Sequence, residues 1–228
     1  FGMGFDFSLS NANSYADAHT ALGYHALCQT KFVNAKDLDN LSSNYESKSD
    51  FLSNNFDDAC FGKATFHTFK KLVIHVEAIQ DVGFLAKKSA LDFMNKFDVV
   101  CGQAYEYTAL SKLCMHPLID VILFDVSKSV QLKPKMILSA CEKGKKIEVM
   151  YGILRNEDRL LKNLILNVKR INECTNGKGI IFSCGSEMKN LLGPQDVISI
   201  AQLCGLNEID AINSISENIK SVLVRAKN

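Results

Sequence analysis

The sequence lacks several features that would place it in a familiar class. It has no apolar run long enough to cross a bilayer and no basic-then-apolar leader, so we expect neither a membrane-spanning helix nor a secretory signal. It also has no Cys-x-x-Cys pair, although it contains eight cysteines. These cysteines are widely spaced and most lie in apolar stretches. We therefore interpret them as reduced core residues of an intracellular protein, and we expect no structural zinc.

Motifs for hydrolytic and nucleotide chemistry are missing as well. Asp6-Phe7-Ser8 stands where barrel phosphoesterases carry His-x-His, and no two of the five histidines share a ligand-like spacing. Ser183, Cys184 and Ser186 border a strand end, where enzymes often place reacting groups, but Gly-x-Ser-x-Gly is absent. Neither phosphate-loop motif, Gly-x-x-x-x-Gly-Lys-Ser/Thr or Gly-x-Gly-x-x-Gly, occurs. These absences speak against a barrel-fold, metal-dependent phosphoester hydrolase, which is the alternative function considered for this sequence.

Charge is distributed unevenly behind a formal net charge of +1. Residues 1–60 carry three Lys and eight Asp or Glu, whereas residues 61–228 carry 23 Lys or Arg and 17 Asp or Glu. The first segment is thus acidic and the remainder mildly basic. This balance permits an anionic partner but does not require one.

Short apolar runs alternate with helix-like segments about every 25–30 residues, which is the rhythm of βαβ units. Near-continuous apolar runs are typical of parallel strands covered on both faces. We therefore predict an α/β fold, either a TIM-barrel-like (β/α) barrel or an open doubly wound sheet, with residues 1–228 as a single domain. The strands are expected at Phe5–Leu9, Leu72–Ile79, Phe97–Cys101, Val121–Val126, Ile147–Tyr151 and Ile180–Cys184.

Local chemistry also predicts one polar segment and the ends of two helices. The segment at about 34–58 is rich in Asn, Ser, Asp and Lys, so we expect an exposed or partly disordered insertion. Gly193-Pro194 is expected to open a helix that stops at Gly205. Asn207 is expected to cap the next helix, with Asp210 as a weak capping-box partner.

A helix over residues 155–171 would carry a basic stripe. On a helical wheel the apolar residues fill one side, and the basic residues gather on the other within roughly 100° of arc. A solvated outer helix and a phosphate-tracking face both explain such a stripe. The basic residues are Arg155, Arg159, Lys162, Lys169 and Arg170.

Over roughly residues 120–226 several motifs follow one another in a definite order: Lys146–Gly152, then a basic helix, Gly179–Glu187, Leu192–Val197 and Leu203–Leu206. This order resembles the C-terminal half of the thirty-kilodalton protein subunit of ribonuclease P, which in eukaryotes is shared with ribonuclease MRP. Upstream agreement is thinner but collinear: it comprises Phe5-Asp6-Phe7, Leu22-Gly-Tyr24, Phe97-Asp-Val-Val100 and His116 through Asp120. Gly-Pro-x-Asp-Val at Gly193–Val197 is closer to the eukaryotic version.

This resemblance implies a TIM-barrel-like fold related to the metal-dependent barrel phosphoesterases, without their metal site. It implies a protein that is not catalytic by itself, because the catalytic RNA, with its own Mg²⁺, cleaves the 5′ leader from precursor tRNA. It also implies pairing with the Pop-five subunit, contact with the other protein subunits, a share in ribosomal RNA processing as part of ribonuclease MRP, and a nuclear and nucleolar location. No cofactor bound by the protein itself and no membrane partner are expected.

The resemblance also implies basic residues that would contact the RNA. These are Lys71, Lys133 or Lys135, Lys143 and Lys189. Residues 92–96 depart from the family, since relatives carry arginines before the strand and this chain has Asp92-Phe-Met-Asn-Lys96. Lys87, Lys88 or Lys96 is expected to substitute.

Overall fold

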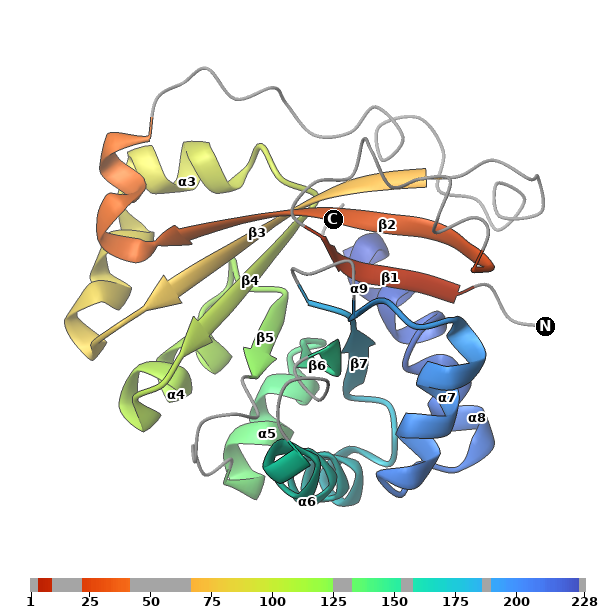
Figure 1. The fold of residues 1–228 in the computed structure, drawn as a ribbon. Helices are drawn as coiled ribbons and strands as arrows, with labels where there is room; N and C mark the ends of the chain where they lie inside the picture. The colour runs from red at the N-terminus through yellow and green to blue at the C-terminus, as the bar shows by residue number, and fades with distance from the viewer. Residues whose placement is uncertain are drawn as a thin grey trace.

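Seven strands form one parallel sheet in which each strand pairs with the next along the chain. In the computed structural model, which describes residues 4–9, 22–41, 67–124, 133–152, 158–185 and 190–225, this sheet is strongly curled (Figure 1). β1, at one end of the strand order, lies beside β7 at the other end. The strands are β1 (Gly4–Leu9), β2 (Tyr24–Asn34), β3 (His67–Val76), β4 (Val99–Ala104), β5 (Val121–Phe124), β6 (Lys146–Met150) and β7 (Ile180–Ser183).

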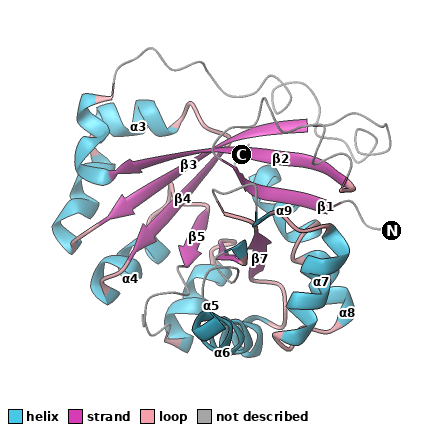
Figure 2. Cartoon of the chain, viewed as in Figure 1, coloured by secondary structure: helices cyan, strands magenta, loops and turns pink. Residues whose placement is uncertain are grey.

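From β2 to β7, helices connect successive strands and cover the outside of the curled sheet (Figure 2). Each helix that follows a strand runs back along the sheet, so its first turn lies near the carboxyl ends of the strands. The described helices are η2 (Ala35–Asn40), η4 (Ile79–Ala86), α3 (Lys88–Met94), α4 (Tyr107–Met115), α5 (Pro134–Glu142), α6 (Asp158–Thr175), α7 (Pro194–Leu203), α8 (Glu208–Asn213) and α9 (Glu217–Arg225).

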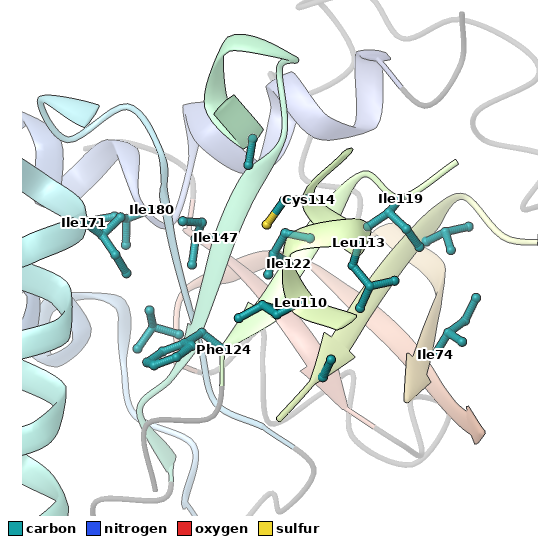
Figure 3. Close-up of a cluster of buried hydrophobic side chains, with 14 of the residues drawn as sticks. Ile74, Leu110, Leu113, Cys114, Ile119, Ile122, Phe124, Ile147, Ile171 and Ile180 are labelled. Atoms are coloured by element: carbon teal, nitrogen blue, oxygen red, sulfur yellow. The ribbon is translucent and has the colours of Figure 1, made fainter. Parts of the chain in front are cut away.

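The larger core lies between the sheet and the outer helices. All residues of β4, β5 and β7 are buried, as expected for parallel strands covered on both faces. Figure 3 shows part of this core, in which Leu110 and Leu113 of α4 pack near Ile122 of β5. The TIM-barrel-like α/β prediction is thereby confirmed.

A second, smaller core fills the inside of the curl. Val73, Cys101 and Val121 point inward from three neighbouring strands and pack with Ile219 and Val222 of α9. The inward strand residues include several near the start of their strands, so α9 covers the amino-terminal end of the barrel. The side-chain amide of Asn218, also on α9, donates to the carbonyls of Gly177 (3.2 Å) and Ile180 (2.8 Å) at the start of β7.

Two parts of the sequence prediction need correction. β2 was not predicted, because Tyr24–Asn34 mixes polar and apolar residues without the continuous apolar run of the central strands. The polar insertion predicted at about 34–58 does not begin at Asn34, since η2 follows β2 directly and buries Ala35 and Leu38 against the sheet. Residues 42–58 of that segment lie outside the described residues.

Helix boundaries follow the predicted local chemistry closely. α7 begins with Pro194, and Gly205 adopts a φ of +96° just after the helix. Asn207 caps α8, because its side-chain oxygen accepts a hydrogen bond from the Asp210 backbone N–H at 2.8 Å. The helix predicted at 155–171 is α6, which extends to Thr175.

Other sequence expectations concern burial and membrane segments. Cys101, Cys114 and Cys204 are buried, as expected for core cysteines. Burial raises the pKa of the Cys114 and Cys204 thiols to about 12. In the part of the chain that the structure describes, none of the helices has the length and hydropathy needed to cross a bilayer.

Candidate nucleic-acid interface

Lys71 was predicted to contact RNA, but the structure places it inside the barrel. Its side chain is fully buried, and its Nζ donates to Oε1 of Glu148 at 2.8 Å. Lys71 comes from β3 and Glu148 from β6, so the ion pair spans the interior of the curled sheet. A buried, neutralised ammonium cannot reach an external phosphate. The prediction for Lys71 is therefore wrong, because residue type alone did not reveal which face of β3 it occupies.

The electrostatics of this pair explain how a charge is kept in the core. Burial is the largest single influence and lowers the pKa of Lys71, but Glu148, Cys101 and Cys28 together raise that pKa above its ordinary value. The Sγ of Cys101 lies 3.9 Å from the second carboxylate oxygen of Glu148. These contacts join side chains from β3, β4 and β6 inside the barrel.

Several other candidates gather at the carboxyl ends of β5 and β6. Lys133 and Lys135 lie at the start of α5, and Lys162 lies in the first turns of the neighbouring α6. All three side chains are exposed. The Nζ of Lys133 sits 4.4 Å from the centroid of the Tyr107 ring, a cation–π contact with the first residue of α4. This end of the barrel therefore presents several cations from rigid helix starts.

The outer face of α6 carries the basic stripe that the helical wheel predicted. Leu160, Leu164 and Val168 are buried against the sheet. The exposed basic residues lie on the opposite side: they are Lys162, Lys169 and Arg170. Leu166 lies among them with 56% of its surface exposed. Cations on one outer helix face can contact successive phosphates, provided that the partner runs along the helix.

Three more candidates are exposed but lie elsewhere. Lys87 and Lys88 join η4 to α3, and Lys87 forms an ion pair with Asp39 that lowers the pKa of that carboxyl. Lys143 follows α5, at the amino-terminal end of the barrel. These positions do not join the group at the start of α5 and α6 in a single surface. Lys96 is half-buried.

The remaining candidates cannot be placed. Arg155 and Lys189 lie outside the described residues. Arg159 belongs to α6, but its side chain is also outside the described part of the chain.

The small residues at the end of β7 serve packing. Ser183 and Cys184 are 1% and 2% exposed, so neither is open to a substrate in this arrangement. The Gly152 N–H donates to the carbonyl of Cys184 at 3.1 Å, and a Cβ on Gly152 would lie 2.0 Å from that oxygen. A larger residue at position 152 would force the two strand ends apart, which accounts for Gly152 at this point of close backbone approach.

Metal-ligating residues are also scattered. Among the side chains that the structure describes, no group of three or more His, Cys, Asp or Glu is placed to hold a metal ion. His75 contacts the ring of Tyr105, and His116 lies near Lys145, where burial and then that ammonium lower its pKa. His19 and the side chains of His25 and His67 lie outside the described residues.

Two cations at the amino-terminal end of the barrel, Arg225 and Lys145, were not predicted from the sequence to have a structural role. Arg225, at the end of α9, donates to the carbonyls of Lys143 (2.7 Å) and Ile119 (3.2 Å) and to Oδ1 of Asp120 (3.0 Å). Lys145 is buried and donates to the carbonyls of His116 and Ile119. Burial, and then the Arg225 charge, lower the pKa of Lys145 to about 8. No local pattern marks this role, because the partners are backbone carbonyls from distant loops.

Comparison with known families agrees with the geometry. The family described as "RNase P subunit p30" matches residues 7–228, which is nearly the whole chain. The chain belongs to the RNase P subunit p30 family. The family predicted from the order of motifs is therefore confirmed.

Members of the p30 family and related proteins are similar at low identity. The chain is 26% identical over 163 residues to the Arabidopsis thaliana protein GAMETOPHYTE DEFECTIVE 1, covering 70% of this chain and 28% of that protein. It is 26% identical over 117 residues to the Mus musculus ribonuclease P protein subunit p30, covering 50% and 44%. It is 21% identical over 218 residues to the Dictyostelium discoideum subunit drpp30, covering 94% and 57%. The matches thus span less than two thirds of each of these relatives.

The p30 fold also has a solved counterpart. A chain in the cryo-EM structure of archaeal ribonuclease P with mature tRNA superimposes with a TM-score of 0.69 and 11% sequence identity. The match covers 97% of this chain and 90% of the archaeal chain. At this identity the likeness establishes the fold, and it agrees with the curled parallel sheet described above.

Proposed function

We propose that this chain is an RNA-binding, non-catalytic protein subunit of ribonuclease P that helps to hold the catalytic RNA in its active shape during removal of the 5′ leader from precursor tRNA. The family match over residues 7–228 is the observation that carries the proposal. The exposed cations at the start of α5 and along α6 supply groups suited to phosphates. Rigid helix positions hold these cations with little need for base-specific contacts.

The partners follow from the same proposal. The chain would bind the ribonuclease P RNA, pair with the Pop-five subunit, and assemble with further protein subunits around precursor tRNA. It would also serve ribonuclease MRP in ribosomal RNA processing, and it would act in the nucleus and nucleolus. We expect Mg²⁺ to act at the RNA, with no cofactor held by the protein itself.

The direct test is affinity for the cognate ribonuclease P RNA as a function of salt. Each phosphate that a lysine or arginine neutralises releases counterions, so log affinity should fall linearly with log salt. We expect at least a roughly ten-fold loss between about 50 and 200 mM salt, the range over which phosphate contacts weaken strongly. A flat response would contradict binding through phosphates.

A second experiment tests membership of the particle. The tagged protein is purified from cells, and the RNA and proteins that accompany it are identified by sequencing and mass spectrometry. We expect ribonuclease P RNA together with Pop-five, and MRP RNA if the subunit is shared. A complex without RNA, or an isolated chain that hydrolyses phosphoesters with a stoichiometric bound metal, would overturn the proposal in favour of the hydrolase.

A further inference from the structure

Three aromatic residues lie near the carboxyl ends of β2, β3 and β4, and two of their rings, those of His75 and Tyr105, are in contact. Paired residues of neighbouring parallel strands share one face of the sheet, so Val73, Cys101 and the paired Phe32 all face the interior side. His75 lies two residues beyond Val73 on the same face, and its ring centroid lies 4.9 Å from that of Tyr105. Figure 1 shows the ends of these three strands side by side.

Phe32 and Tyr105 are accessible and His75 is half-buried, although the inner faces of their strands are otherwise largely buried. Phe32 exposes 46% of its surface and Tyr105 exposes 40%, while other inward residues of the same strands, such as Val73 and Cys101, are fully buried. The exposed rings therefore mark the point where the inner face of the sheet emerges from the core. We call Phe32, His75 and Tyr105 the aromatic edge.

Cations lie next to this edge. Tyr107, two residues after Tyr105, carries the Nζ of Lys133 at 4.4 Å from its ring centroid and exposes 38% of its surface. Lys135 lies beside Lys133 at the start of α5 and is also exposed. A planar apolar surface beside fixed positive charge matches the two parts of a nucleotide, a flat base and an anionic phosphate.

The aromatic edge also contains a ring nitrogen, Nδ1 of His75, that is buried and has no hydrogen-bond partner within the described part of the chain. The exposed Lys133 beside Tyr107 complements the anionic phosphate of a nucleotide, whereas a purely apolar protein segment would leave that charge without a partner group. The chemistry of the edge thus favours a nucleobase over an apolar protein segment.

We infer that the aromatic edge stacks an unpaired base of the bound RNA. This inference rests on the proposed function, and it adds a base-stacking contact to the phosphate contacts of α5 and α6. Stacking on Tyr105 tolerates any base, because each base presents a flat π-face. The contact would therefore select single-stranded over base-paired RNA without reading sequence.

The test uses the full chain with two fluorescently labelled probes, a short single-stranded oligoadenylate and a base-paired RNA duplex of the same length. Tyr105→Leu keeps an apolar side chain but removes the flat ring. We expect it to weaken oligoadenylate binding by roughly 5- to 100-fold, the loss typical of one base–aromatic stack, and to leave duplex binding unchanged. Ile209→Ala, at an exposed apolar position on α8, is the matched control and should alter neither.

A second variant gives a direct optical signal. The sequence contains no tryptophan, so Tyr105→Trp creates a single indole at the edge. We expect Tyr105→Trp to bind oligoadenylate as well as the unmodified chain does, with its fluorescence quenched on binding. Quenching requires ring-to-base contact and would not follow from a distant binding site.

Each outcome decides the inference. Unchanged oligoadenylate affinity in Tyr105→Leu, or no binding of oligoadenylate by the unmodified chain, overturns base stacking. If salt-dependent binding of the cognate RNA persists in that case, the proposed function stands and only the edge is wrong. If cognate RNA binding is also absent, the proposed function fails with it. Loss of a co-purifying protein from Tyr105→Leu, with oligoadenylate binding intact, assigns the edge to a protein partner and overturns the inference.

Discussion

The interior of the barrel and the outer face of α6 both contain lysines, but the two environments give them opposite roles. Lys71 is buried and its Nζ pairs with the Glu148 carboxylate at 2.8 Å, so its charge is balanced inside the fold. Lys162 and Lys169 are exposed on the outer face of α6 and remain available to a partner. The difference shows that a basic residue is a candidate for RNA contact only once its side of the strand or helix is known.

The largest expected effect comes from breaking the interior pair. Lys71→Met should destabilise the protein by about 3–5 kcal/mol, because it leaves the Glu148 carboxylate buried without its counter-ion. Urea unfolding followed by circular dichroism measures this loss. The double variant Lys71→Met/Glu148→Leu should recover most of it, since it removes both charges together. Equal stability of the single and double variants would contradict the pairing.

Charge reversal on the outer face of α6 should weaken RNA binding and leave the stability of the fold nearly unchanged. Lys162→Glu with Lys169→Glu should reduce affinity for the cognate RNA by roughly ten-fold or more and reduce the slope of its salt dependence. Stability should change by less than about 0.5 kcal/mol, as is usual for exposed positions. The matched control is Lys112→Glu, an exposed lysine on α4 outside the candidate set. Because Lys112→Glu reverses one charge and the test variant reverses two, an equal loss of binding free energy per reversed charge would show that the effect reflects net charge and not the stripe.

A third prediction concerns Lys145, a cation that is buried but has no carboxylate partner as close as that of Lys71. Its pKa in the folded protein is about 8, below the value of about 10.4 for an unfolded chain. The cost of burying the protonated amine is therefore present below pH 8 and disappears as pH rises toward that unfolded value. Relative to Lys145→Gln, the unmodified protein should gain about 1 kcal/mol between those pH values, allowing for solvent screening. Parallel pH profiles from urea unfolding would refute this.

The smallest expected effect belongs to Lys133, whose charge is exposed but rests against an aromatic ring. Lys133→Ala removes the contact with the Tyr107 ring and should cost about 0.5 kcal/mol of stability, the value for an exposed cation–π pair. Thermal unfolding of the unmodified protein, Lys133→Ala, Tyr107→Leu and the double variant isolates the pairwise interaction energy. An additive double variant would show that the two side chains do not interact.

The parts of the structure that were predictable depend on local chemistry. The central strands are continuous apolar runs, and Pro194, Gly205 and Asn207 mark helix ends through backbone geometry and capping. β2 was not predictable, because it mixes polar and apolar residues without a regular period and is recognised as a strand by its pairing with β1 and β3. The two faces of α6 were predicted from the helical wheel, because the 3.6-residue period places apolar and basic residues on opposite sides within one segment.

The site was less predictable, because exposure and long-range pairing decide it. Lys71 could not be told from an exposed lysine, since its partner Glu148 lies 77 residues further along the chain. The aromatic edge was also missed, because Phe32, His75 and Tyr105 come from three separate strand ends. Tyr105-Glu106-Tyr107, directly after a buried strand, is the sequence signal that could have drawn attention to that end of the barrel.

The position of α9 has a consequence for how the protein is made. Ile219, Val222 and Leu223 belong to the last described helix, yet they fill the space between strands that leave the ribosome much earlier. During synthesis the inner surfaces of those strands therefore stay in contact with water until α9 has left the ribosome. A chain that stalls before Glu217 would keep this apolar surface exposed, which favours aggregation.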